Sequence, residues 1–368
     1  MKITVLSHNL SSNSVMRAHR LAVAARHFAE VRLLGPIERR GLWPALPHEP
    51  WIRTVPERRF PSFHRSFLEL VDAADGDVLI ACKPMLASYG AALVAAERRG
   101  NVPVVLDCDD LDVAFSPREL WDEDPSLADL RRPASAVYVS LLTKAAPAAS
   151  AITVASTGLQ RRFGGTVIPH GSLTELFNPR KIDRAAARKE FRFGSPTVLF
   201  AGTPRWHKGL KPLAKAVRRI PSAQLAVLCR PEDLSEPEWK EYPLIRLPMV
   251  PYSTLPRVLA AADIVAIPQL DTEAARCQMP MKVYDCMAVG APIVATAVSD
   301  LPEVLDGCAR IVPPGQSKEL RHAIRDLLNS PGEARTLGER ARARCLKQFS
   351  MQSVADKLSQ VVRNVTRA

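Results

Sequence analysis

The sequence predicts an α/β protein of two doubly wound domains, each an open parallel sheet with helices on both faces. Its 368 residues are too many for one ordinary core and suit two domains. Short β-branched runs alternate with helical patterns in both halves of the chain. A polar, charged stretch from Phe177 to Pro196 separates the halves and predicts a linker. We expect the two sheets to face a cleft at their strand ends.

In the first half, the apolar runs predict strands at Ile3–Leu6, Val31–Leu34, Val78–Cys82, Val102–Asp107, 152–154 and 167–168, with helices at Ser14–Phe28 and Ala87–Arg99. The Pro- and Arg-rich piece from Gly35 to Pro61 predicts a long loop. After it, Ser62–Val71 has the pattern of an amphipathic helix with Phe63 and Phe67 near one face. Such a helix suits either peripheral membrane contact or packing beneath a loop.

The second half repeats the alternation. Its predicted strands are Thr197–Ala201, Ala223–Leu228, Ile245–Leu247, Ile264–Ile267, Pro292–Thr296 and Ala309–Val312, and its predicted helices are Lys211–Arg219, Leu255–Ala261, Lys282–Val289, Pro302–Leu305 and Lys318–Asn329. Two further helices are expected from Ala334 to Arg367. We therefore expect an N-terminal domain over 1–180, a C-terminal domain over 195–345, and a last helix over 346–368 that packs back toward the N-terminal domain.

Cysteine usage and hydropathy indicate the cellular compartment in which the protein is expected. The seven cysteines form no Cys-x-x-Cys pair and have no histidines at metal spacing, which favours a reducing compartment over a disulfide framework or structural zinc. Polar residues from Ser7 to Ser14 interrupt the apolar start, so a buried first strand is expected in place of a signal peptide. No apolar run approaches the roughly 18 residues of a membrane span. We expect a cytoplasmic protein, soluble or peripheral at the inner face of the membrane.

The formal net charge of +12 is unevenly distributed. Residues 1–70 hold 11 Lys/Arg against 5 Asp/Glu, residues 71–130 hold 4 against 13, and residues 318–368 hold 11 against 5. No nucleic-acid-binding module is recognisable, so a nucleic-acid partner is not expected. A phosphorylated substrate and an anionic membrane surface account for the charge, as would a solvated basic face.

The segment 198–209 (VLFAGTPRWHKG) carries the first chemical signal. A buried strand ends at Gly202, and Arg205 and Lys208 follow just before a predicted helix. Backbone N–H groups at a helix start favour anions, and the two cations add full charges. Arginine offers planar bidentate contacts and lysine a point charge, so the pattern favours a diphosphate. An ordinary capped surface turn would have the same pattern.

The segment 279–296 (MPMKVYDCMAVGAPIVAT) carries the second signal. It predicts a loop, a helix that ends at Gly290, and a buried strand. Asp285 follows Lys282 by three residues, so both project from one side of the helix. A carboxylate there can accept hydrogen bonds from the two vicinal hydroxyls of a ribose. The alternative is an exposed ion pair within the helix.

Together these segments resemble the retaining, GT-B-type glycosyltransferases of family four. The resemblance assigns the donor diphosphate to Gly202, Arg205 and Lys208, the last two as catalytic residues. The family block Pro-x-Lys-x-(Tyr/Phe)-(Glu/Asp)-x-(Met/Leu)-Ala-x-Gly is matched from Pro280 through Gly290, and its acid, here Asp285, would bind the ribose. The resemblance is strong over roughly 165–350 and weak before it.

Two more segments agree with the resemblance. Residues 250–268 (VPYSTLPRVLAAADIVAIP) resemble the family's loop near the base and the helix and strand that follow, and residues 167–179 (VIPHGSLTELFNP) resemble its domain junction, which includes His170. The usual first Glu, eight positions before the ribose-binding acid, is here Cys277. Contact with the donor sugar is then expected from Gln278 or from loop backbone at 275–280. The implied donor-binding residues are Gly202, Thr203, Met249, Val250, Cys277, Gln278, Met279, Pro280, Met281, Lys282 and Asp285.

The acceptor side is less defined. The family's Gly-Gly loop after the first strand is replaced by residues 8–14 (HNLSSNS), and its cleft-wall histidine has no match. We assign Asn9, Ser11, Asp107 and Asp109 to the acceptor side. The carboxylates from Asp107 to Asp112 could also attract a metal. The fold class commonly dispenses with metal because cations neutralise the leaving group, so neither metal nor cofactor is expected.

The resemblance implies a retaining glycosyltransferase that moves a sugar from a nucleoside-diphosphate donor to a glycan or lipid-linked acceptor, in envelope polysaccharide or glycoconjugate synthesis. A nucleotide-sugar epimerase of similar fold needs the same donor grip, and Cys277 leaves room for a catalytically silent nucleotide-sugar-binding protein. A nicotinamide dehydrogenase is disfavoured because no Gly-x-Gly-x-x-Gly follows the first strand.

Overall fold

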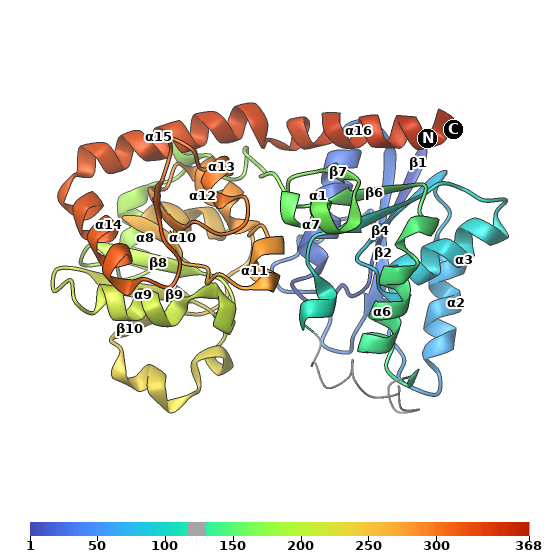
Figure 1. Ribbon diagram of the computed structural model, residues 1–368, viewed down its shortest axis with the longest axis horizontal. Helices are drawn as coiled ribbons and strands as arrows, with labels where there is room; N and C mark the ends of the chain where they lie inside the picture. The colour runs from blue at the N-terminus through green and yellow to red at the C-terminus, as the bar shows by residue number, and fades with distance from the viewer. Residues whose placement is uncertain (116–129, 368) are drawn as a thin grey trace. The chain divides into compact units, whose positions relative to one another are not determined.

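The structure, a computed structural model, describes residues 1–115 and 130–367 (Figure 1). The chain folds into two compact units. The first comprises Met1–His170 together with the C-terminal residues from Met351, and the second is Gly171–Ser350. Residues 171–196, for which the sequence predicted the end of the first domain and a linker, thus belong to the second unit. Their helix α8 (Arg184–Glu190) packs against α10 (Leu255–Ala261), and Phe177 is fully buried.

The first unit is built on a parallel sheet of seven strands in the order β3-β2-β1-β4-β5-β6-β7. The strands are β1 (Lys2–Ser7), β2 (Glu30–Ile37), β3 (Ile52–Pro56), β4 (Val78–Cys82), β5 (Val104–Cys108), β6 (Ala151–Val154) and β7 (Thr166–Val167). All five residues of β4 and of β5 are buried, as the near-continuous apolar runs predict for central strands covered on both faces.

Helices cover both faces of this sheet. They are α1 (Val15–Ala25), α2 (Phe63–Ala73), the π-helical turn η1 (Leu86–Gly90) leading into α3 (Ala91–Arg98), α6 (Ala136–Lys144), α7 (Thr157–Phe163) and α16 (Met351–Arg367). The last helix, α16, packs on α1, which is buried almost all round as a result. On the other face, α2 packs on α3.

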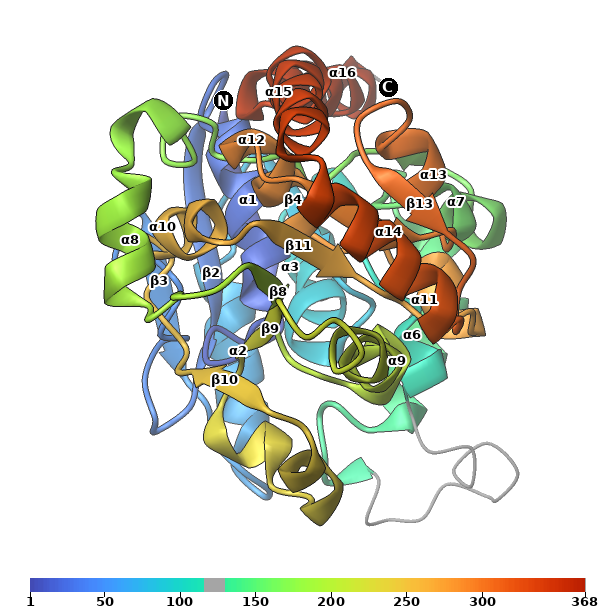
Figure 2. The ribbon, with the colours of Figure 1, turned by 90° about the vertical axis from the view of Figure 1, so that its left-hand side faces the viewer.

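The second unit has a parallel sheet of six strands in the order β10-β9-β8-β11-β12-β13 (Figure 2). The strands are β8 (Thr197–Ala201), β9 (Gln224–Leu228), β10 (Leu244–Leu247), β11 (Ile264–Ile267), β12 (Ile293–Thr296) and β13 (Arg310–Val312). The helices α9 (Leu210–Val217) and α14 (Ser317–Asn329) pack together on one face. The other face carries α8, α10, α12 (Lys282–Val289) and α15 (Pro331–Gln348).

Both sheets reverse their winding direction beside their first strand. In the first unit β1 lies between β2 and β4, and in the second unit β8 lies between β9 and β11. Ligands of doubly wound sheets bind in the crevice that such a reversal opens beyond the carboxyl ends of the strands. The segments after β1 and β4, and after β8 and β11, are therefore the places to look for sites. Within the described ranges, no helix is long and apolar enough to cross a membrane.

Candidate functional site

A cation lies against the end of β8. Lys282, the first residue of α12, donates from Nζ to the carbonyl oxygen of Ala201 over 2.6 Å. The same ammonium lies 4.5 Å from the centre of the Phe200 ring. Gly202 follows with φ 129°, and a Cβ there would lie 3.1 Å from Lys282 Nζ. Glycine at this position provides both the backbone conformation and the room for the ammonium.

The environment of Lys282 disfavours its charge. Burial lowers the pKa of Lys282 to about 8, because no carboxylate among the described residues compensates for the water that the ammonium loses. Its recorded partners are a neutral carbonyl oxygen and an aromatic face. An anion held beside Gly202 would supply the missing opposite charge.

The loop after β8 brings a second lysine to the same region. Arg205 caps the short helix η5 (Trp206–Lys208) and is exposed, as is Trp206 with 72% of its surface accessible. Lys208 is half-buried, and its Nζ donates to Oε1 of Gln278, a residue that follows α11 (Glu273–Cys277). Lys208 Nζ also lies 3.4 Å from Oε1 of Gln269, beyond the end of β11.

Gly209 fixes where this loop runs. Its φ is +71°, and an added Cβ would overlap the carbonyl oxygen of Pro268. Gln269, the residue directly after Pro268, has only 1% of its surface exposed, and its Nε2 has no hydrogen-bond partner within residues 1–115 and 130–367. A buried amide donor with no partner costs stability unless a ligand accepts from it. The ends of β8 and β11, where the winding of the sheet reverses, therefore carry Lys208, Lys282 and the amide donor of Gln269.

Asp285 lies one turn along α12 from Lys282, with 2% of its surface exposed. Its Oδ1 accepts a hydrogen bond from Ser172 Oγ over 2.8 Å, and Tyr252 OH lies 3.4 Å from the same oxygen. Hydroxyl donors of the kind that a ribose would supply therefore already surround the carboxylate. The ion pair within the helix, the alternative to ribose binding, is not what the structure records, because Lys282 binds the end of β8 instead.

The other predicted donor residues lie on the loops that flank these groups. Thr203 accepts a hydrogen bond from Arg205 N through its carbonyl. Met249 and Val250 are half-buried in the loop that leads from β10 to Tyr252. From the last residue of α11 to the start of α12, the buried residues are Cys277, Met279 and Pro280, and the half-buried ones are Gln278 and Met281.

On the acceptor side, Asp107 at the end of β5 is fully buried. Its carboxylate accepts from Arg17 Nε over 2.9 Å and Nη2 over 2.7 Å, and from Thr153 Oγ1 over 2.7 Å. The same guanidinium donates to the carbonyl of Ile168. This bidentate pair ties α1 to the sheet, so the carboxylate of Asp107 is held inside the fold by Arg17 and Thr153.

The neighbouring carboxylates surround Lys83, which follows β4 with a left-handed φ of 70°. Its Nζ lies 3.1 Å from Asp109, 2.9 Å from Asp110 and 2.8 Å from Asp112. Burial raises the pKa of Asp109 to about 7 in spite of the lysine, and the two other carboxylates add to the rise. Asp109 therefore has acid–base character near neutral pH.

The loop after β1 holds the two remaining acceptor-side residues. Asn9 donates from Nδ2 to Glu38 over 2.8 Å, and its Oδ1 accepts from Ser11 N over 2.6 Å. Ser11 is buried, and its Oγ accepts from the backbone N–H of Glu38 over 2.9 Å. Ser11 therefore organises the loop, whereas Asn9 also lines a cavity described below.

Known proteins resemble part of the chain in sequence. Residues 205–360 match a family model described as Glycosyl transferase-like. Over 201 residues the chain is 32% identical to the MMP alpha-(1->4)-mannosyltransferase of Mycolicibacterium hassiacum, covering 51% of this chain and 46% of that protein. The alignments span less than half the length of the curated relatives that the chain matches.

Solved structures are similar over the whole chain. The sucrose-phosphate synthase of Thermosynechococcus elongatus has a TM-score of 0.74 at 19% identity, covering 100% of this chain and 99% of that one. Anabaena HepE, in a crystal structure with UDP-glucose, has a TM-score of 0.72 at 16% identity, covering 100% of both chains. The chain has the GT-B fold. Two Rossmann-like units of parallel sheet in one chain are what this fold requires.

Three side chains of this GT-B chain contact the predicted donor residues but were not found from the sequence. Gln269 could have been found, because it follows the strand beside β8 at the winding reversal. Ser172 and Tyr252 contact Asp285 from 113 and 33 residues away in the chain. Both lie in segments that resemble the family, 167–179 and 250–268, but nothing local in the sequence pairs their hydroxyls with Asp285.

Proposed function

We propose that this chain is a glycosyltransferase that moves a sugar from a nucleoside-diphosphate donor to a glycan or lipid-linked acceptor, with retention of anomeric configuration. The observation that carries the proposal lies at the ends of β8 and β11. Lys282 donates to the carbonyl of Ala201 beside Gly202, and Lys208 lies 3.4 Å from the buried Gln269, whose amide nitrogen has no partner in the part of the chain that the structure describes. The family match over residues 205–360 includes Lys208, Gln269 and Lys282, and the similar HepE structure contains UDP-glucose.

The donor diphosphate would lie beside Gly202, between Arg205, Lys208 and Lys282. The Nε2 of Gln269 would donate to a phosphate oxygen, which would satisfy the buried amide. A ribose would reach Asp285 in exchange for, or beside, its present hydroxyl donors. The base would lie near Met249 and Val250, and the sugar near the loop from Cys277 to Met281.

Catalysis would follow from charge that develops on the leaving diphosphate. Breaking the glycosyl–phosphate bond places negative charge on the β-phosphate oxygen, and Arg205 and Lys208 stabilise this charge where it forms. For retention, the departing oxygen accepts the acceptor's proton on the face where the sugar leaves, and no protein base is needed. Neither a metal nor another cofactor is part of this proposal.

The acceptor would bind to the first unit. Of the residues assigned to this side, Asn9 lines a cavity and Asp109 has a raised pKa, whereas Asp107 and Ser11 hold the fold together. Envelope polysaccharide or glycoconjugate synthesis is the proposed setting, with a cytoplasmic location that allows contact with the inner face of the membrane.

The first experiment identifies the donor. Uridine, guanosine and adenosine diphosphate sugars are screened for a rise in melting temperature, because a ligand that binds only the native state raises it. The stabilising donor is then incubated with and without candidate acceptors, and the anomeric configuration of the product is read by NMR. If the donor sugar is isomerised when no acceptor is present, the protein is an epimerase and the transferase proposal is wrong.

The alternative of a catalytically silent nucleotide-sugar-binding protein is favoured by Cys277 at the position of the usual acid. Restoring the acid by Cys277→Glu distinguishes the two. If the chain is a transferase, the wild-type protein already transfers the sugar. If it is a silent binding protein, the wild type binds the donor without turnover, and any turnover appears only in Cys277→Glu.

A further inference from the structure

A cavity of about 480 Å³ opens in the first unit at the winding reversal of its sheet. His8 and Asn9 line it from the end of β1, Pro36 from the end of β2, and Met85 from the segment after β4. Its size falls within the range of small-molecule sites, and its place is the crevice where doubly wound sheets bind ligands.

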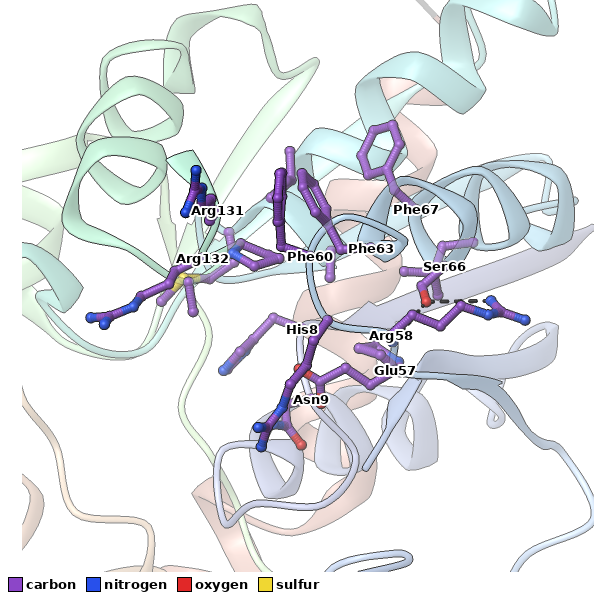
Figure 3. A pocket seen from close by; sticks show the side chains of 18 residues that line it. His8, Asn9, Glu57, Arg58, Phe60, Phe63, Ser66, Phe67, Arg131 and Arg132 are labelled. Carbon is purple, nitrogen blue, oxygen red and sulfur yellow. Dashed lines mark hydrogen bonds between the residues drawn. The ribbon is translucent and has the colours of Figure 1, made fainter. Parts of the chain in front are cut away.

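One wall of the cavity is apolar and aromatic. Phe63, Phe67 and Leu70 line it from α2, Phe60 from the loop before α2, and Leu86 from η1. Phe60 has 51% of its surface exposed, although a large apolar side chain gains most when it is covered. Figure 3 shows Phe60 and Phe63 together in the middle of the cavity, with Phe67 farther along the same helix.

The rim of the cavity is basic. Arg131 and Arg132 close one side, and the Arg131 guanidinium lies 5.0 Å from the centre of the Phe60 ring (Figure 3). Arg58 and Arg59 line the other side and also belong to a second, adjoining hollow of about 950 Å³.

That second hollow has an excess of positive charge. Five arginines line it, at 39, 40, 58, 59 and 65, against two glutamates. One glutamate, Glu38, is paired with Arg40 over 2.9 Å, and Arg58 pairs outside the hollow with Glu69 over 2.8 Å. An aromatic chamber that opens onto an arginine-lined hollow complements a molecule with an apolar part and a strongly anionic part.

We propose that this cavity binds a single anionic amphiphile, whose hydrocarbon chain lies against Phe60, Phe63 and Phe67 and whose phosphate lies on Arg58 and Arg59. The amphiphile would be the acceptor, a lipid-linked phosphate, and this identification rests on the transferase function proposed above. The binding itself does not depend on that function.

Two other occupants fit the observations less well. A plain oligosaccharide would leave the apolar wall without a partner that excludes water. A membrane surface would call for apolar side chains that project outward, whereas Phe63 and Phe67 are half-buried and line a hollow. Leu68, on the same helix, is the outward-pointing residue, with 40% of its surface exposed.

The test uses dodecyl phosphate below its micellar concentration as the probe, titrated calorimetrically into the full chain without a donor. We expect binding of one molecule per chain, and affinity at least about tenfold weaker for inorganic phosphate and for the uncharged dodecyl maltoside. Phe63→Ala and Arg59→Gln should each weaken binding about tenfold or more. The matched controls Leu68→Ala and Arg53→Gln, exposed residues that line neither hollow, should bind as the wild type.

Each variant is checked by its melting temperature and by its retained thermal shift with the donor. Because the donor residues lie in the second unit, a variant with a normal donor shift and no amphiphile binding supports the cavity as the site. Amphiphile affinity that is unchanged in Phe63→Ala and Arg59→Gln would overturn the proposal. So would binding of anionic phosphatidylglycerol vesicles without binding of the monomeric probe, since that outcome indicates a membrane surface.

Discussion

Lys282 should take up a proton when a nucleoside diphosphate binds beside Gly202. Burial holds the pKa of the free protein's Lys282 at about 8, and adjacent phosphates would restore it toward its usual 10.5. At pH 8.5 about a quarter of the free protein carries the proton, and nearly all of the complex would, so about 0.7 proton is taken up. At pH 7 the uptake falls to about 0.1 proton.

Calorimetric titration measures this uptake. Binding enthalpies at pH 7 and pH 8.5 are recorded in two buffers of different ionisation enthalpy, with whichever of UDP, GDP and ADP stabilises the protein most. Lys282→Met should abolish the difference between the two pH values. The control Lys211→Met removes an exposed lysine of α9 that is paired with Glu238, and should leave it unchanged. Equal uptake in wild type and Lys282→Met would refute the reasoning.

The same pKa shift affects stability. Because the folded-state pKa of Lys282 lies below its unfolded value, the unfolded chain binds more protons between about pH 8 and 10.5. The free energy of unfolding should therefore rise with pH through this window. The contribution amounts to about 3 kcal/mol, and Lys282→Met should lack it. Urea unfolding curves across the window measure the slope.

Three further predictions concern single side chains. Lys208→Ala should lower turnover by about a hundredfold or more, while the affinity for the donor falls less. A turnover number within severalfold of the wild-type value, measured by steady-state kinetics, would exclude a role of Lys208 at the leaving group. Gly209→Ala places a Cβ onto a backbone carbonyl and should lower the free energy of unfolding, measured in urea, by about 3 kcal/mol or more. Gly307 also has a positive φ but has open space around it, so Gly307→Ala should lower that free energy by about 1 kcal/mol. Asp107→Asn should destabilise the protein by about 3–5 kcal/mol because it leaves the buried guanidinium of Arg17 without a counter-charge. The control Asp72→Asn, in an exposed ion pair, should change stability by less than about 0.5 kcal/mol. Similar losses in the two variants would contradict the structural role of Asp107.

The sequence predicted the central strands well and an edge strand not at all. Continuous apolar runs such as 78–82 and 197–201 fit either buried strands or short buried helices, and their alternation with helical patterns favours strands. The strand β3 was missed inside the expected long loop. Its five residues include Arg53, Thr54 and Pro56, which an edge strand tolerates because one side faces no partner.

The candidate site was predictable where it depends on strand ends and less so elsewhere. A glycine at the end of a buried strand followed by cations locates the Gly202–Lys208 loop from local sequence alone. Asp107 pairs with Arg17, which lies 90 positions away in the chain. The carboxylate that the sequence assigned to the acceptor side is therefore engaged in a buried ion pair. Only the packing of α1 on the sheet reveals this.

The discontinuity of the first unit affects how the protein folds during synthesis. The second unit is one uninterrupted stretch and can complete its core as soon as it leaves the ribosome, whereas the first must wait for its last helix. Until then the outer side of α1, which α16 later covers, stays accessible to water and to chaperones. A stop codon just before Met351 would consequently harm the half of the protein that is translated first.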